Sequence, residues 1–361
     1  MKTHGCKLVI EKDGMTLCGK PFYLASGDMH YFRCFKEGWY RRLKLMKDFG
    51  LTAVQTYVPW NMHEPEEGKF VFDDNLNIAE FLSLCDEVGL KVLLRPTPYI
   101  CSEWDWGGLP CWLQAKKCAI RTNDPEYIKY LKKYYEHLTK EFIPYLSING
   151  GPIIAVAIEN EYGSFSDDNE YLKMAGDMLK EMGVDSVFYT SNGVEKFKMK
   201  AGSHPEYYTT FDFHGLTDEM IKDIKDYQPD KPIMAAEFWA GRSQQWGGYF
   251  QRQKPEDVQK AYASLLDKGV LVNFYMFCGG SNFGFHNGAL VGRYGADAEG
   301  APNRYIPFAT SYDVDALITE YGYPTEKYYL CKAVLKKYLE KNNIEFNGSA
   351  DMGDYKCTTQ S

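Results

Sequence analysis

The sequence predicts an α/β fold, a (β/α)8 TIM barrel that follows a short N-terminal β-hairpin. Eight short segments rich in β-branched and apolar residues alternate with amphipathic helical segments along the 361 residues, which is the pattern of such a barrel. No GxGxxG follows the first strand, so a doubly wound dinucleotide-binding sheet has no support. A helix–glycine–apolar–strand junction also recurs, and the glycine ends each helix. The four junctions are Gly50-Leu51, Gly89-Leu90, Gly183-Val184 and Gly269-Val270.

The first residues, 7–21, are predicted to form the hairpin, with Asp13-Gly14 as its turn. The barrel strands follow from short apolar runs bounded by turn residues. The predicted strands cover 22–31, 52–60, 91–100, 153–161, 187–192, 207–214, 232–239 and 270–278.

The helices between these strands follow from apolar residues that recur every three or four positions. The helix around 37–49, for example, carries Trp39, Leu43 and Met46 on one face. The other predicted helices cover 76–88, 125–146, 169–182, 217–226, 255–267 and 326–341. We therefore expect one catalytic (β/α)8 domain over 1–341 and a polar tail or linker remnant over 342–361. No C-terminal β domain is expected in this chain.

Composition limits the classes of function. Apolar residues make up 45% and charged residues 25%, as in ordinary soluble globular proteins. A net charge of -8 and a pI near 5.5 argue against a nucleic-acid or anionic-membrane partner. Aromatic residues are frequent at 16%. They fit a packed core, and flat amphipathic rings also line sugar-binding clefts.

The chain shows no sign of a targeting or membrane segment. The stretch MKTHGCKLVIEKDG has no long apolar region, and no run approaches the ~18 apolar residues of a membrane span. Ten cysteines occur without a CxxC pair, and Cys85, Cys278 and Cys331 lie inside strand or helix patterns. These features predict a cytoplasmic protein with reduced, buried thiols.

One buried strand ends in an unusual cluster of polar residues. Six apolar residues at 153–158 run directly into Glu159-Asn160-Glu161, and the carboxyl ends of barrel strands are where such folds place their chemistry. Two residues apart on a strand, Glu159 and Glu161 are expected to share one face. A carboxylate at an apolar strand end is costly unless it is paired or used. Glu159 fits a buried ion pair as well as a site, whereas Glu161 favours a site.

A second strand has the same construction. Residues 233–236 read Ile-Met-Ala-Ala and lead into Glu237. Two carboxyls from different strands match the needs of glycoside hydrolysis, in which one acid protonates the leaving oxygen and one carboxylate attacks or activates water. Spacing by itself does not assign the two roles to Glu161 and Glu237.

Other predicted strand ends are polar or aromatic as well, namely Tyr57, Glu103, Asn192, His214 and Tyr275. Each is more often structural, but their recurrence at the same end of successive strands favours a site. The sequence has neither HExxH nor a Cys/His cluster, and no GxSxG elbow. A metal site is therefore weakly supported, and a serine nucleophile lacks its usual motif.

Seven blocks of sequence resemble glycoside hydrolase family 35, the β-galactosidase family, over about 22–335. They are SGDMHYFR, TYVPWNMHEPEEGKF, RPTPYICSEWDWGGLPCWL, GGPIIAVAIENEYGSF, AAEFWAG, YMFCGGSNFGFHNGA and TSYDVDA. The resemblance implies a retaining exo-β-glycosidase, above all a β-galactosidase, that acts by double displacement on a small carbohydrate. It makes Glu161 the acid/base and Glu237 the nucleophile, with carboxyls roughly 5–5.5 Å apart for a retaining mechanism. The residues that would bind the sugar are Tyr57, Cys101, Ser102, Glu103, Asn160, Trp239 and Tyr275. The resemblance implies no metal and no organic cofactor.

Two departures from the family pattern concern the sugar. Val314 replaces a tyrosine of SYDYDAP, and Arg242 replaces the second aromatic of EFWPGW. The alternatives are therefore an exo-β-glycosidase for glucosamine or for a modified or acidic galactose, and a sugar-binding barrel that has lost catalysis. The two glutamates argue against the last. The sequence leaves the linkage, the natural substrate and the oligomeric state open.

Overall fold

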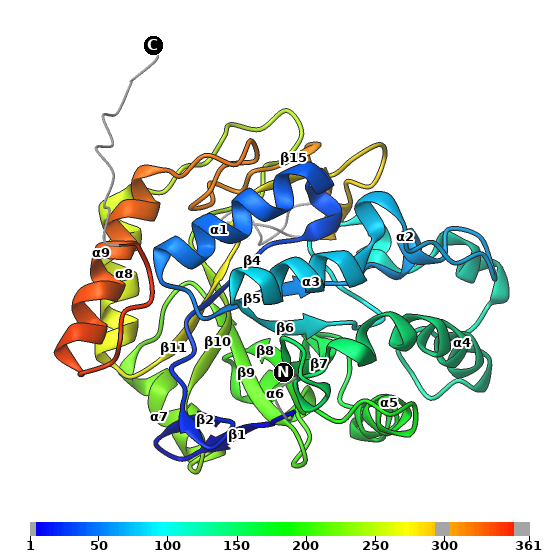
Figure 1. The fold of residues 1–361 in the computed structure, drawn as a ribbon. Coiled ribbons are helices and arrows are strands. Elements are labelled where there is room, and N and C mark those ends of the chain that lie inside the picture. The colour runs from blue at the N-terminus through cyan, green and yellow to red at the C-terminus, as the bar shows by residue number, and fades with distance from the viewer. Residues whose placement is uncertain (1–4, 293–303, 350–361) are drawn as a thin grey trace.

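The computed structural model of the chain describes residues 5–292 and 304–349. Its centre is a closed parallel barrel with the strand order β10-β11-β4-β5-β6-β7-β8-β9 (Figure 1). The predicted (β/α)8 fold is thus confirmed. Each predicted barrel strand is present, and most are shorter than expected. Their bounds are β4 Ser26–Asp28, β5 Ala53–Tyr57, β6 Lys91–Arg95, β7 Ile153–Asn160, β8 Val187–Gly193, β9 Tyr208–Phe213, β10 Met234–Trp239 and β11 Leu271–Tyr275.

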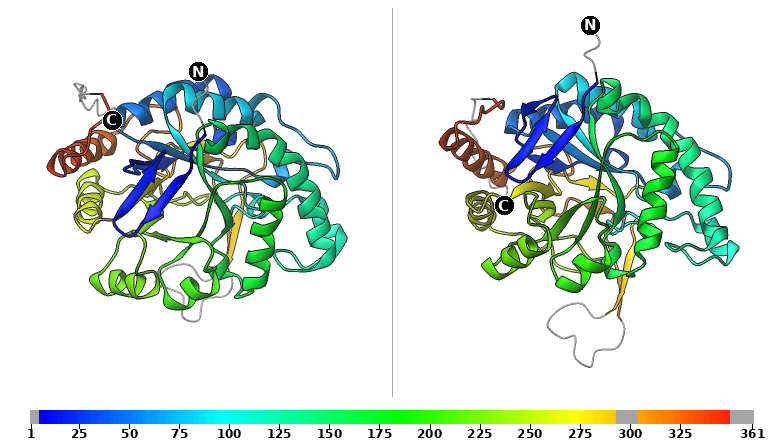
Figure 2. Two further views of the ribbon diagram at one scale, coloured as in Figure 1. Left: turned by 60° about the horizontal axis from the view of Figure 1, so that its bottom comes forward. Right: turned by 90° about the horizontal axis from the view of Figure 1, so that it is seen from below.

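Helices surround this barrel (Figure 2). The predicted helices appear as α1 Trp39–Phe49, α3 Ile78–Val88, α4 Pro125–Phe142, α5 Asn169–Glu181, α7 Asp218–Tyr227, α8 Pro255–Asp267 and α9 Glu326–Lys341. Two short helices were not expected, α2 Trp60–His63 and α6 Lys196–Ala201. Gly50 and Gly89 end α1 and α3 in the left-handed conformation, with φ of 106° and 79°. Glycine adopts this conformation without a Cβ clash, which explains the junctions.

The N-terminal strands are β1 Leu8–Glu11, β2 Gly14–Leu17 and β3 Lys20–Pro21. Glu11 pairs with Gly14, so the two-residue turn is Lys12-Asp13, one position earlier than predicted. Leu8 and Met15 pack with side chains of the barrel interior, including Leu93 and Ile154. The hairpin therefore covers the amino-terminal end of the barrel (Figure 2).

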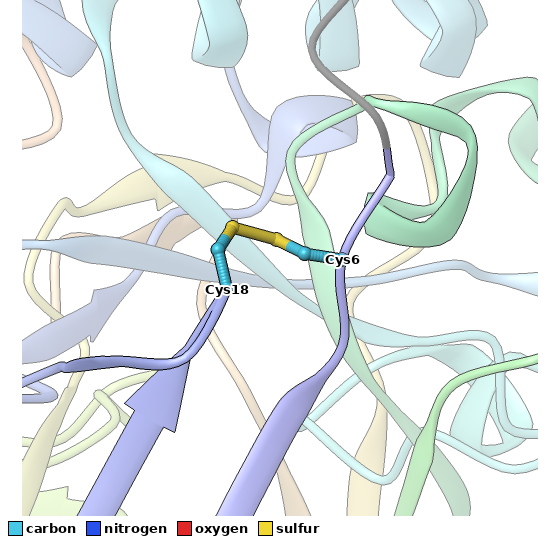
Figure 3. The surroundings of a disulfide bond; sticks show 2 residues. All are labelled: Cys6 and Cys18. Atoms are coloured by element: carbon cyan, nitrogen blue, oxygen red, sulfur yellow. A yellow bond between two sulfur atoms is a disulfide. The ribbon is translucent and has the colours of Figure 1, made fainter.

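A disulfide joins Cys6 to Cys18 (Figure 3), which makes the prediction of ten reduced thiols wrong for this pair. The two cysteines are 12 residues apart, and no CxxC pattern marks them. Pairing of Leu8 with Leu17 brings the flanks of β1 and β2 together, so the two Cα atoms lie 4.9 Å apart. Cys85, Cys278 and Cys331 are buried free thiols, as predicted. The prediction of burial is wrong for Cys111, which is a free but exposed thiol, and Cys357 lies outside the described residues.

The long connection from β11 to α9 returns over the carboxyl end of the barrel. It carries β12 Gly280–Ser281, β13 Ala289–Gly292, β14 Arg304–Pro307 and β15 Ser311–Tyr312. The Gly288 amide donates to the Glu103 carbonyl at 2.8 Å, which ties this connection to the loop after β6. In residues 5–292 and 304–349, no helix is long and apolar enough to cross a membrane.

Candidate active site

Glu237 lies near the carboxyl end of β10 and is 7% exposed. The Tyr57 phenol donates a hydrogen bond to its Oε1, and the Trp239 indole N–H donates to Oε2 at 3.1 Å. Nη1 of the buried Arg95 lies 3.4 Å from Oε1. Hydrogen bonds to an ionised acceptor are stronger than neutral ones. This setting therefore stabilises a carboxylate charge on Glu237.

Glu161 follows directly after β7 in a left-handed conformation, with φ 45° and ψ 40°. Its amide donates to the Ser191 carbonyl at 2.9 Å. Burial, followed by the nearby charge of Glu237, raises the pKa of the Glu161 carboxyl to about 7. Near neutral pH this group can therefore both give and take a proton, as a general acid/base must.

Glu159 lies in a different environment. Arg121 donates to both of its oxygens, with Nε–Oε1 at 3.0 Å and Nη2–Oε2 at 2.8 Å, and the Tyr171 hydroxyl donates to Oε1 at 3.1 Å. The ion-pair interpretation of Glu159 is confirmed. Its expected sharing of a face with Glu161 is wrong, because side chains alternate only along extended backbone and Glu161 is left-handed.

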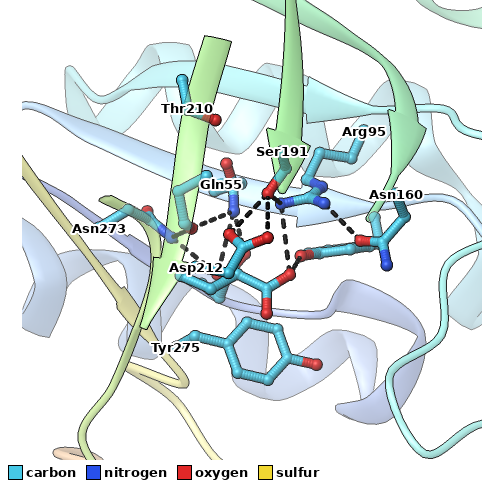
Figure 4. A network of polar contacts seen from close by, with 12 residues as sticks. Gln55, Arg95, Asn160, Ser191, Thr210, Asp212, Asn273 and Tyr275 are labelled. Atoms are coloured by element: carbon cyan, nitrogen blue, oxygen red, sulfur yellow. Dashed lines mark hydrogen bonds and ion pairs between the residues drawn. The ribbon is translucent and has the colours of Figure 1, made fainter. Parts of the chain in front are cut away.

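A ring of polar side chains lines the barrel, with one member from each strand; we call it the polar ring. Its members are Asp28, Tyr57, Arg95, Asn160, Ser191, Asp212, Glu237 and Asn273. Figure 4 shows how most of them converge. Arg95 Nη2 donates to Asn160 Oδ1, Nη1 donates to Ser191 Oγ at 3.3 Å, and the guanidinium lies 4.3 Å from the Tyr57 ring centroid.

Sequence reasoning overlooked Arg95, Ser191 and Asp212. The one available signal for Arg95 was a cation at the end of the apolar strand Lys-Val-Leu-Leu-Arg. Burial raises the pKa of Asp212 and of Asp28 well above the usual range, and the charge of Glu237 adds to both shifts. Asp28 accepts from the amides of Gln55 at 3.1 Å and Asn273 at 2.7 Å.

The loop after β6 carries three of the predicted sugar-binding residues in succession. Cys101, Ser102 and Glu103 have φ of 55°, 58° and 48°, a left-handed region that costs non-glycine residues of order 1–3 kcal/mol each. The Tyr275 hydroxyl donates to Ser102 Oγ at 3.1 Å. The Tyr312 hydroxyl donates to Glu103 Oε2 at 2.5 Å. Two hydroxyls from other segments, Tyr275 on β11 and Tyr312 on the distant β15, thus contact this loop.

The buried Arg33 holds this loop. Its Nη2 donates to the Ser102 carbonyl at 2.5 Å, and Nε donates to Asn282 Oδ1 at 2.8 Å. Its Nη1 lies 2.6 Å from His30 Nδ1, and the guanidinium stacks 3.6 Å from the Tyr312 ring centroid. Four segments that are distant in sequence therefore meet on one side chain.

The remaining candidates lie around this centre. Burial and the charge of Glu161 raise the pKa of the Cys101 thiol to about 12. Val314, left-handed with φ 45°, is buried in a small apolar cluster with Tyr312. Arg242 is exposed, and its charge adds to burial in lowering the pKa of His214. Asn192 is structural, since its amide donates to the Gly202 carbonyl at 2.9 Å.

The arrangement suits acid/base and nucleophilic chemistry at two unequal carboxyls. In the part of the chain that the structure describes, no group of three or more His, Cys, Asp or Glu side chains is placed to hold a metal ion. Glu237 is held by two hydrogen-bond donors and one cation, whereas the Glu161 carboxyl has a pKa near neutrality.

Comparison with known proteins gives a consistent family match. The profile of "Glycosyl hydrolases family 35" matches residues 14–338. The mouse "Beta-galactosidase" is 38% identical over 340 residues, covering 92% of this chain and 50% of the mouse protein. The human "Beta-galactosidase" is 39% identical, covering 91% of this chain and 47% of the human protein. The chain thus spans about half the length of these relatives.

Solved structures show the same fold at low sequence identity. The β-galacturonidase from Eisenbergiella tayi aligns with a TM-score of 0.57 and 16% identity, covering 92% of this chain and 54% of that one. The β-galactosidase from Marinomonas ef1 aligns with a TM-score of 0.60 and 12% identity, covering 90% and 61%. At these identities the likeness concerns the fold alone.

Proposed function

Because this chain belongs to glycosyl hydrolase family 35, we propose that it is a retaining exo-β-glycosidase that hydrolyses terminal β-galactosides. The observation that carries the proposal is the inequality of its two carboxyls. Glu161 has a pKa of about 7, whereas Glu237 accepts from Tyr57 and Trp239 and pairs with Arg95. Double displacement requires one protonated and one ionised carboxyl at the start.

In the first step of this mechanism, protonated Glu161 gives its proton to the glycosidic oxygen as the bond to the anomeric carbon breaks. Ionised Glu237 attacks that carbon and forms the glycosyl-enzyme. The charge on Glu237 falls in this step and returns when the intermediate breaks down. Arg95 and Tyr57 stabilise this charge before and after the covalent stage.

In the second step, ionised Glu161 accepts a proton from water, and that water attacks the anomeric carbon on the same face from which the leaving group departed. The product keeps its β configuration, and both carboxyls return to their starting states. Loss of the Glu237 charge in the first step favours the ionised form of Glu161, because like charges no longer repel.

The sugar hydroxyls would meet polar groups on two sides. Asn160 lies beside Arg95 at the end of β7, and Glu103 and Ser102 project from the left-handed loop. Tyr275 lies against that loop. The relatives named as β-galactosidases support galactose as the sugar.

The test is a panel of nitrophenyl β-glycosides assayed with the parent chain and with Glu237→Gln. We expect hydrolysis of the β-galactoside by the parent, a β-configured first product by NMR, and loss of turnover in the variant. A 2-deoxy-2-fluoro galactoside should label the peptide that contains Glu237. An α-configured first product would contradict the retaining mechanism, and a parent inactive on the whole panel would favour a sugar-binding barrel.

An acidic sugar is the second candidate, and exposed Arg242 after β10 favours it. A guanidinium close to the entrance of the site would stabilise a substrate carboxylate. Comparing β-galactoside with β-galacturonide for the parent and Arg242→Ala decides this point. Equal ratios for the two proteins would exclude a role for Arg242.

A further inference from the structure

Arg95 is the cation that connects the nucleophile to the sugar-binding side of the candidate site. Its side chain is fully buried. One nitrogen bonds Asn160, and the other, Nη1, is shared between Ser191 Oγ at 3.3 Å and Glu237 Oε1 at 3.4 Å. A long side chain keeps one conformation only when its surroundings hold it. The groups that hold Nη1 therefore affect the position of Arg95 relative to both Asn160 and Glu237.

Ser191 is itself held by a carboxyl. Its Oγ lies 2.6 Å and 2.7 Å from the two oxygens of Asp212 (Figure 4). Asp212 is 2% exposed, and it occupies the register position opposite Glu237 on the neighbouring strand. The Ser191 hydroxyl accepts a hydrogen bond from Arg95 and can still donate its own O–H, and it donates that hydrogen bond to the Asp212 carboxyl. The contacts thus run from Asp212 through Ser191 to Arg95.

The charges around Asp212 argue against a negative charge on its own carboxyl. It faces Glu237 on β10, Glu161 beyond β7, Tyr189 on β8 and Arg95 on β6. Arg95 contacts Glu237 directly but reaches Asp212 only through Ser191. A second buried anion without its own cation is costly. Burial and the charges of Glu237 and Glu161 accordingly raise the pKa of Asp212.

We propose that Ser191 and Asp212 form a positioning pair, in which a neutral Asp212 holds the Ser191 hydroxyl and Ser191 fixes Arg95 between Asn160 and Glu237. The inference rests on the proposed glycosidase function. It assigns to β8 and β9 a role in organising the reaction, although neither residue touches the sugar. A neutral Asp212 also removes one negative charge from the surroundings of Glu161.

The pair predicts an unusual order among variants. Ser191→Ala and Asp212→Ala should each lower kcat/KM by about tenfold or more, and the double variant should lose little beyond either one, because the residues act as a unit. Asp212→Asn keeps the shape and both hydrogen-bonding functions. The kcat/KM of this variant should stay within about threefold of that of the parent. The fall in kcat/KM at alkaline pH, where Glu161 loses its proton, should occur at the same pH as in the parent.

A matched control is Thr210→Ala on the same strand. Thr210 is buried, and its hydroxyl donates to the Thr190 carbonyl at 2.7 Å, outside the contacts of Arg95. This variant should lower Tm with little change in kcat/KM. Parent-like activity of Ser191→Ala would overturn the pair. So would an Asp212→Asn variant as damaged as Asp212→Ala, or one whose alkaline limb moves to lower pH by about half a unit or more.

A second measurement does not depend on activity. It therefore distinguishes failure of the positioning pair from failure of the proposed glycosidase function. Infrared difference spectra of the parent against Asp212→Asn at pH 7 should show the carbonyl stretch of a protonated carboxylic acid in the parent. Absence of that band would overturn the neutral state of Asp212. A parent that hydrolyses no glycoside but retains the band would instead overturn the function and leave the neutral carboxyl established.

Discussion

Tyr57 and Glu237, 180 residues apart in the chain, meet through a hydrogen bond from the phenol to Oε1. Their strands, β5 and β10, are three places apart around the barrel. The same oxygen lies 3.4 Å from Arg95, so the carboxylate is oriented and stabilised before any substrate binds. This preorganisation distinguishes Glu237 from Glu161, whose carboxyl has a raised pKa, and the following predictions depend on that difference.

Glu161→Gln should reveal the role of the acid through the leaving group. We expect kcat/KM for poor leaving groups, such as alkyl galactosides, to fall about 10²- to 10⁴-fold. Dinitrophenyl galactoside, which needs no proton, should form the glycosyl-enzyme almost as fast as in the parent. Azide should then accelerate turnover by attacking the intermediate. An equal loss for all leaving groups would contradict the assignment.

The pH profile should report the same group. Glu161 must be protonated in the free enzyme to act as acid, and its pKa is about 7. For an alkyl galactoside, kcat/KM should therefore fall above about pH 7. Dinitrophenyl galactoside provides the control. Its leaving group needs no proton, so its kcat/KM should fall much less above pH 7. A kcat/KM that stays constant up to pH 9 for both substrates would contradict the role of Glu161 as the acid.

Stability should depend on pH through Glu161 in a defined direction. Its pKa is raised from 4.5 to about 7 in the folded state, so between these values the native state binds more protons than the unfolded state. The free energy of unfolding of the parent should fall across that window, with the full cost present above pH 7.

Glu161→Gln lacks this charge, so its stability relative to the parent should rise from near zero at pH 4 to at most about 3 kcal/mol at pH 8. Urea unfolding at both pH values measures the difference. A pH-independent difference would show that Glu161 titrates normally.

Arg33→Lys tests the support of the left-handed loop. Lysine keeps the charge but cannot bond the Ser102 carbonyl and Asn282 while stacking on Tyr312. Because the loop presents Ser102 and Glu103, we expect KM to rise by about tenfold, with a smaller change in kcat. Arg41→Lys, at a cation–π contact with the exposed Tyr323, should leave both constants unchanged. A loss of kcat in Arg33→Lys without any rise in KM would contradict this role of Arg33.

Arg121→Met should separate structure from chemistry at the end of β7. It leaves Glu159 buried without its cation, which costs about 3–5 kcal/mol of stability. Breaking the exposed Lys222–Asp226 pair by Lys222→Met should cost no more than about 0.5 kcal/mol. Chemical denaturation of both variants measures the contrast, and similar values would contradict the buried ion pair.

Part of this site could be predicted because it depends on local pattern. Short β-branched runs and glycine-ended helices specify the order of strands and helices through backbone preferences over a few residues. Parallel strands in a barrel place their carboxyl ends at one face, so Glu161 and Glu237 could be assigned to one cleft without a structure.

Closure of the barrel decided the rest. It brings Tyr57, Arg95, Ser191, Asp212 and Glu237 into one ring, although long stretches of sequence separate them, and no local pattern records which strands become neighbours. In the closed barrel Glu159 pairs with Arg121, whereas Glu161 has a left-handed backbone and a pKa that the charge of Glu237 raises. The sequence alone therefore determined which carboxyls end the strands. The tertiary structure determined their partners, because burial and proximity set the energy of a charge.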